Sequence, residues 1–232
     1  MEKKLKISYF GCSFTALEDS KSGYLFENYR HIVDRELDVF SKNYSFQGKS
    51  NQHIFDDVYN AVNNDVKNEP QFKHIFLIQT TFNNRLGLPC DIEDKFVSMC
   101  KTGSPDNLTE EIEIKFYNDW LKYFYSRSNS LKEFRKQTEL IACYLDMNHI
   151  SYSFIGIDET LDFITERDFF GRYRFIEFDN TFSYYNYVTQ KKLRITDVPN
   201  FTPLNGVEDY HFNKDGHEIL AKKIIERIKQ MG

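Results

Sequence analysis

Short apolar runs alternate along the chain with longer stretches in which apolar residues recur every three or four positions. Residues 5–10, 74–79 and 151–156 are rich in Ile, Leu, Phe and Tyr, which predicts buried strands. The stretches 22–40 and 52–66 have a helical period, and so does the spacing of Ile219, Leu220, Ile224, Ile225 and Ile228. This alternation of strand and helix favours an α/β fold with a parallel sheet covered on both faces.

The region 86–148 interrupts this alternation. Residues 86–107 form a polar connection that contains Gly and Pro, and residues 109–148 are mainly helical in period, with a break expected near 126–130. We therefore expect a single domain over 1–232 with a mainly helical insertion around 86–148.

The region 169–187 is unusually aromatic. Residues 172–178 alternate as in a short strand, and residues 182–187 contain one Phe and three Tyr. Because aromatic side chains mostly fill cores, packing is the favoured interpretation. A substrate-facing wall, or a contact in a homo-oligomer, is the alternative, since tyrosines suit both sugar and protein surfaces.

Composition narrows the class of protein. The 232 residues are 41% hydrophobic, which is enough for one sizeable core. The net charge of −5 and the scattered basic residues argue against a nucleic-acid partner. No long apolar stretch or signal-peptide core is found, so we expect a cytoplasmic protein without a membrane span. The abundance of Phe and Tyr, with many Asn and Lys, is typical of AT-rich genomes such as those of bacteriophages or low-GC bacteria.

Four cysteines are too few for a disulfide framework in a chain of this length, and none has a Cys-x-x-Cys spacing. They are Cys12, Cys90, Cys100 and Cys143. We expect free thiols in a reducing compartment.

Two segments at opposite ends of the chain carry candidate catalytic chemistry. Ser13 follows the first predicted strand through the turn Gly11-Cys12, at the sheet edge where open α/β folds bind ligands. His211 precedes Asn213 and Gly216, which lead into the last predicted helix. Ser13 is the candidate nucleophile and His211 its candidate base.

Each of these residues has another interpretation. Ser13 suits a helix N-cap, His211 suits a polar loop, and Cys12 is a rival nucleophile, although neighbouring side chains at such a turn point in different directions. Asp209, His211 and His217 are metal ligands by type, but no fourth ligand is indicated and no metal is expected. We expect His217 to be an exposed or half-buried residue of the first turn of its helix.

With these residues the sequence resembles the SGNH hydrolases, the GDSL-like esterases and lipases. The first block of that family is Gly-Asp-Ser or Gly-x-Ser, here Gly11-Cys12-Ser13, and the last is Asp-x-x-His or a close variant followed by Pro-Asn-x-x-Gly. Here the last block reads His211-Phe212-Asn213, with Gly216 in place and phenylalanine where proline is usual. Asp209 stands two residues before the histidine and Glu208 three.

The resemblance extends to two inner blocks. A short strand over 44–48 ending at Gly48 matches the block whose glycine N–H binds an oxyanion. The strand 74–79 leads to Asn83-Asn84, which stands in for Gly-x-Asn-Asp without its glycine. The resemblance implies Ser13, Gly48 and Asn83 as the oxyanion hole, with Asn84 and Thr81 as rivals of Asn83.

The resemblance also implies a fold, a reaction and a substrate class. The fold would be a three-layer α/β/α sandwich with a flavodoxin-like parallel sheet of about five strands. Ser13 would attack an ester carbonyl, His211 would take its proton, and Asp209 or Glu208 would orient the imidazole. A small acyl ester such as an O-acetylated carbohydrate or metabolite is the expected substrate, without a cofactor. Acyl transfer by the same triad and a catalytically decayed binding or assembly protein are the alternatives.

Overall fold

The computed structural model describes residues 3–16, 27–46, 49–83, 86–90, 95–99, 115, 119, 126–199 and 211–231. Four parallel strands form its main sheet in the order β2-β1-β3-β6. They are β1 (Lys4–Phe10), β2 (Phe40–Asn43), β3 (Phe72–Gln79) and β6 (Ser151–Ile155). The predicted α/β class with a parallel sheet is confirmed.

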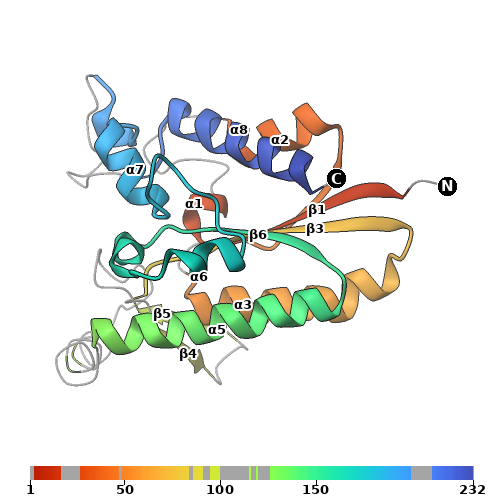
Figure 1. The fold of residues 1–232 in the computed structure, drawn as a ribbon, viewed down its shortest axis with the longest axis horizontal. Coiled ribbons are helices and arrows are strands. Elements are labelled where there is room, and N and C mark those ends of the chain that lie inside the picture. Colours follow the sequence, from red (N-terminus) through yellow and green to blue (C-terminus); the bar gives the residue numbers. More distant parts are fainter. Residues whose placement is uncertain are drawn as a thin grey trace.

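Helices cover both faces of this sheet, as Figure 1 shows. The helices α2 (Tyr29–Leu37) and α8 (Lys214–Gln230) lie together on one face, and α3 (Asn51–Ala61) and α5 (Arg127–Met147) lie on the other. Successive side chains of β3 serve the two layers in turn: Ile75 and Leu77 pack under α8, and Phe76 and Ile78 pack over α3. A strand buried on both faces is continuously apolar, and the apolar run at 74–79 predicted β3 for this reason.

Capping residues define the ends of the predicted helices. Ser50 accepts a hydrogen bond from the His53 backbone at the start of α3, and Asn213 accepts one from Gly216 at the start of α8. The helix α3 continues into a π-helical turn over Val62–Val66, so the helix expected over 52–66 is confirmed.

The segment between β1 and α3 differs from the prediction. The helix expected over 22–40 ends at Leu37 among the described residues, because Asp38 adopts the left-handed conformation with φ 48°. The strand expected over 44–48 is wrong at residues 44–46, the part of it that the structure describes; β2 lies earlier, at Phe40–Asn43, and is exposed throughout. An exposed edge strand of mixed polarity has no apolar run by which to find it.

A two-stranded antiparallel sheet lies within the region expected to be a polar connection. It pairs β4 (Leu86–Cys90) with β5 (Lys95–Met99). The helix α5 begins after its cap Ser126, which is where the break in the helical region was predicted. The assignment of 1–232 as one domain with a helical insertion stays a prediction.

The aromatic region 169–187 contains two helices, α6 (Arg167–Arg172) and α7 (Tyr184–Lys191). The strand predicted over 172–178 is wrong, because residues 173–178 pair with the edge of β6 only at Phe154–Phe175. Most of the aromatic residues are buried: Phe169, Phe170, Tyr173, Phe175, Phe178, Phe182 and Tyr184. The packing interpretation therefore holds for these seven residues.

Candidate active site

Ser13 lies in a tight turn directly after β1, at the carboxyl edge of the sheet, where α1 begins (Figure 1). Ser13 opens the short helix α1 (Ser13–Ala16), which is closed by a 2.9 Å hydrogen bond from Ala16 N to Cys12 O. A Cβ atom on Gly11 would lie 2.5 Å from Thr15 Oγ1 and 2.6 Å from Gln79 Oε1. Only glycine fits this position, because Thr15 and Gln79 are hydrogen-bonded to each other there.

Cys12 points away from solvent. It is fully buried, and its Sγ lies 3.9 Å from Gln79 Oε1 in the core. Ser13 is half-buried. Of the two neighbouring nucleophile candidates, the serine is therefore the one that a substrate can reach.

His211 contacts Ser13 across the sheet edge. Its Nε2 lies 3.0 Å from Ser13 Oγ, although the two residues are 198 positions apart in the sequence. The backbone on both sides is fixed, since Ile195 N donates to His211 O at 2.8 Å and Asn213 N donates to Leu193 O at 2.8 Å. The distance is that of a hydrogen bond between a nucleophile and a general base.

Phe212 anchors the histidine loop. Its side chain is buried, and its ring centroid lies 4.8 Å from that of Phe14 and 4.6 Å from that of Tyr184. The phenylalanine that replaces the usual proline of the resembled motif thus has a packing role. The ring of Phe14 also lies 4.6 Å from the imidazole of His211.

Asp209 and Glu208, the candidate acids, lie outside the described residues, as do Gly48 and Asn84 of the predicted oxyanion hole. Their roles stay predictions.

Asn83 lies at the carboxyl end of β3, in a loop held from two sides. Its backbone N–H donates to Asp158, and its Oδ1 accepts from Asn51 Nδ2 at 3.0 Å. Its Nδ2 is buried and has no hydrogen-bond partner among the described residues. The rival Thr81 also has a buried, unpartnered hydroxyl, but its side chain is wholly buried whereas Asn83 is partly exposed.

Asp158 was not predicted from the sequence. It is 3% exposed, and its carboxylate accepts from the Thr160 N–H at 2.6 Å as well as from Asn83. Burial raises the pKa of this carboxyl group, against the effect of those hydrogen bonds. The signal that could have identified Asp158 in the sequence is its position after β6, at the same carboxyl edge of the sheet as Asn83.

His217 was expected to be exposed or half-buried, and this is wrong. It is 8% exposed, and its Nδ1 accepts from the Tyr29 backbone N–H at 3.4 Å. Burial lowers its pKa to about 3, with smaller contributions from His211 and Arg30. The imidazole is therefore neutral. Its role is structural, because it packs between α8 and α2.

No group of three His, Cys, Asp or Glu side chains suited to a metal ion occurs among the residues that the structure describes. Asp209 of the candidate metal set lies outside them.

Aromatic side chains form a row beside the serine and histidine. The Phe82 ring centroid lies 6.2 Å from that of Phe14 and 5.6 Å from that of Tyr185. Tyr185 comes from α7 and is only partly buried, unlike its neighbour Tyr184, whose hydroxyl donates to Gly216 O. Part of the 169–187 region thus lies close to the candidate site.

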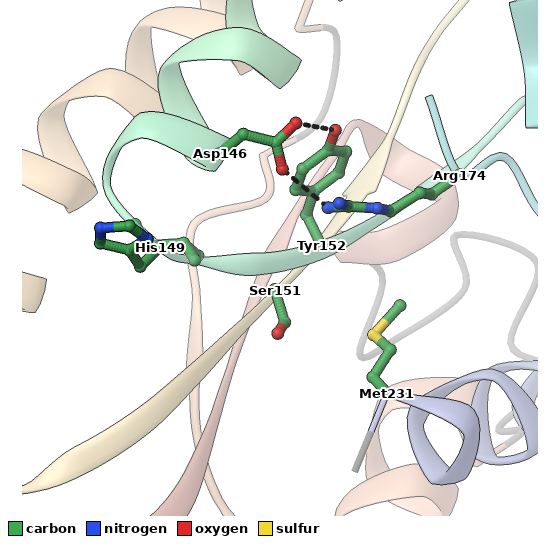
Figure 2. Close-up of a pocket in the computed structure, with 7 residues that line it drawn as sticks. Asp146, His149, Ser151, Tyr152, Arg174 and Met231 are labelled. Carbon is green, nitrogen blue, oxygen red and sulfur yellow. Dashed lines mark hydrogen bonds and ion pairs between the residues drawn. The ribbon is translucent and has the colours of Figure 1, made fainter. Parts of the chain in front are cut away.

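A separate pocket of about 460 Å³ lies at the opposite edge of the sheet, where β6 begins and α8 ends (Figure 2). The Asp146 carboxylate at its wall accepts from Arg174 at 3.0 Å and from the Tyr152 hydroxyl at 3.3 Å. His149 points away from these three side chains in Figure 2. The charged groups drawn there pair with each other, and Ser13 and His211 are not part of this pocket.

Within the described ranges, no helix is both long enough and apolar enough to cross a bilayer.

No known family model matches the sequence, and no curated protein does. The similar solved structures include three that align along nearly the whole chain. One is a protein described as lipolytic and of the G-D-S-L family from Desulfitobacterium hafniense DCB-2, with 13% identity, a TM-score of 0.41, and coverage of 97% of this chain and 99% of that one.

The second is the psychrotrophic esterase EstA from Pseudoalteromonas sp., solved in a form inhibited by monoethylphosphonate. It has 11% identity and a TM-score of 0.42, and 97% of each chain is covered. The third is TesA, with 11% identity, a TM-score of 0.43, and coverage of 98% of this chain and 99% of that one.

Proposed function

We propose that the protein is a serine ester hydrolase whose nucleophile is Ser13 and whose general base is His211. The observation that carries this proposal is the 3.0 Å contact between Ser13 Oγ and His211 Nε2. A half-buried serine and histidine from the two ends of the chain meet at the sheet edge where α/β folds bind ligands. This contact also counts against a catalytically decayed site.

The chemistry follows from the acceptor role of Nε2. As Ser13 Oγ forms a bond to the acyl carbon, its proton passes to Nε2, and the carbonyl π electrons move to the oxygen. Collapse of this intermediate expels the alcohol, which takes the proton back from His211. Water then repeats the two steps on the acyl-enzyme, releasing the acid and the free serine.

His211 has to carry its own hydrogen on Nδ1 for Nε2 to accept. In this proposal Asp209 or Glu208 accepts that Nδ1–H and stabilises the imidazolium. The oxyanion is bound by the backbone N–H groups of Ser13 and Gly48 and by the side-chain amide of Asn83. Removing one such donor costs roughly 3 kcal/mol of transition-state stabilisation.

The proposed substrate is a small acyl ester, such as an O-acetylated carbohydrate or metabolite. The partly exposed Tyr185, which packs on Phe82 in the row of aromatic side chains, supports this substrate class, because its ring can stack on a sugar and its hydroxyl can form a hydrogen bond to one. Faster cleavage of long-chain than of acetyl esters would contradict it. Diversion of product to added acceptor alcohols would instead identify an acyltransferase.

The test is labelling by a fluorophosphonate together with hydrolysis of p-nitrophenyl acetate. We expect the wild type to be labelled and active, and Ser13→Ala to lose both properties while keeping its circular dichroism spectrum. Ser151→Ala is the matched control, because Ser151 lies in the same pocket as His149 and is a serine outside the proposed site. Labelling that survives Ser13→Ala would overturn the proposal.

A further inference from the structure

Asn51 binds the loop that carries Asn83. Its side-chain Oδ1 accepts from Thr81 N at 2.7 Å, and its Nδ2 donates to Thr81 O at 3.0 Å and to Asn83 Oδ1 at 3.0 Å. Asn51 is 8% exposed and is the first residue of α3, whose start is fixed by the cap Ser50. One buried side chain therefore connects the start of α3 to the loop that follows β3.

These hydrogen bonds determine the orientation of the side-chain amides of Asn51 and Asn83, that is, where the oxygen and the nitrogen of each lie. The oxygen and nitrogen of a side-chain amide are similar in shape, so the orientation follows from the partners. A backbone N–H only donates and a backbone C=O only accepts, so Thr81 requires Oδ1 of Asn51 on one side and Nδ2 on the other. The second hydrogen of Nδ2 then requires an acceptor, which is Asn83 Oδ1.

This orientation also determines where the nitrogen of the Asn83 amide lies. With Oδ1 turned toward Asn51, Nδ2 is directed away from it, and this buried donor has no partner among the described residues. Burying such a donor unpaired costs roughly 1–3 kcal/mol, so a partner supplied by a ligand is favoured. The residue before Asn83, Phe82, contacts the residue after Ser13, Phe14, so the two loops are neighbours.

We propose that Asn51 is a positioning residue that turns the Asn83 amide so that its N–H₂ group faces the developing oxyanion. This inference rests on the proposed function and adds a residue to it. Asp158 complements Asn51, because it fixes the backbone N–H of Asn83 while Asn51 fixes the side chain.

The substitution Asn51→Asp tests the inference with little change of shape. The introduced carboxylate still accepts from Thr81 N, but it offers no hydrogen to Thr81 O or to Asn83 Oδ1. The Asn83 amide then turns to donate to the carboxylate, and its oxygen faces the oxyanion. We expect kcat to fall by roughly 10²–10³-fold, as for removal of an oxyanion donor, with KM little changed.

Two readouts separate positioning from a general loss of structure. Asn51→Asp combined with Asn83→Ala is expected to be no slower than Asn83→Ala alone, because both changes remove the same donor. Lowering the pH is expected to raise the ratio of variant to wild-type kcat, since the protonated carboxyl group has an O–H to donate. Asn148→Asp, which removes a donor to Tyr144 O at the end of α5, is the control and keeps the wild-type kcat.

If Asn51→Asp does not fold, Asn51→Ala replaces it in the same double-mutant cycle. Additive losses in the cycle, or an unchanged kcat in a folded Asn51 variant, would overturn the inference. Full activity in Asn83→Ala, with Ser13→Ala inactive, would also overturn it and leave the proposed hydrolase intact. Activity in Ser13→Ala would instead remove the proposed function.

Discussion

Gly11 constrains the geometry of the turn that carries Ser13. We expect Gly11→Ala to lower the free energy of unfolding by about 1–3 kcal/mol, because the new Cβ would push apart the hydrogen-bonded side chains of Thr15 and Gln79. The rate of p-nitrophenyl acetate hydrolysis is expected to fall as well. Ser13 and Thr15 lie in the same short helix α1, so a displacement of Thr15 also displaces Ser13.

Gly171→Ala is the matched control for this substitution. A Cβ on Gly171 meets nothing within 4 Å, and the residue lies inside α6. Alanine is favoured there by roughly 0.5–1 kcal/mol over glycine. Urea unfolding of both variants checks the prediction, and equal losses in the two would contradict it.

His217 makes stability depend on pH. Its pKa is lowered to about 3 in the folded protein from an ordinary value near 6.5, so the unfolded chain binds the extra proton between these values. Stability is thus fully present above about pH 6.5 and falls as the pH is lowered toward 3, by up to about 1.4 kcal/mol per pH unit. Burial of His53, with a pKa of about 4, acts in the same direction.

We expect His217→Gln, which keeps an acceptor for the Tyr29 N–H, to reduce the slope of stability against pH. The reduction corresponds to up to one proton fewer taken up on unfolding. Urea unfolding at several pH values between 3 and 7, on the wild type and on this variant, measures the two slopes. A His217→Gln slope equal to that of the wild type would show that this residue is not the one that titrates.

Among the helices, α8 has an N-cap, Asn213, that lies two residues from His211, the proposed general base. Asn213→Ala is expected to cost about 1 kcal/mol of stability through the lost bond to Gly216 N. We also expect kcat to fall tenfold or more, since small misplacements of a catalytic group are costly.

Ser126→Ala provides the comparison for this cap. Ser126 caps α5 through Asn129 N, and α5 lies on the face of the sheet opposite to α8. A similar stability loss with unchanged turnover is expected there, measured by thermal unfolding and ester hydrolysis. If both variants lose turnover equally, the cap of α8 has no special role in placing His211.

The elements differ in how well their sequence predicts them. The strands β1, β3 and β6 were found because they are buried on both faces and read as continuous apolar runs. The exposed strand β2 was placed too late, and the pair β4–β5 was taken for a connection. The helix α2 ends at Leu37 with Asp38, rather than a glycine, in the left-handed position after it, so nothing in the composition marks its end.

The candidate site divides in a similar way. Ser13 and His211 stand in short motifs, so the chain order and the resemblance were enough to select them. Asn51 and Asp158 hold Asn83 from 32 and 75 positions away. Such hydrogen bonds between distant segments leave no periodic or local signal, and only the assembled sheet edge reveals them.

The two apolar layers make the site depend on the entire sheet. Ser13 follows the strand between β2 and β3, and His211 precedes the helix that packs on α2. We therefore expect urea to abolish fluorophosphonate labelling and the near-ultraviolet circular dichroism of the buried aromatics in one shared transition. Loss of labelling at a clearly lower urea concentration would show that the site opens before the core does.

The contact between Ser13 and His211 also has a consequence for biosynthesis. Ser13 is synthesised 198 positions before His211, and α8 follows His211 in the sequence. A nascent chain that ends before His211 cannot contain the proposed catalytic pair, and its strand β1 has no α8 to pack against. Under the proposed function, such incomplete chains therefore do not expose the cell to hydrolytic activity, and the synthesis of His211 and α8 sets the earliest moment at which the enzyme becomes active.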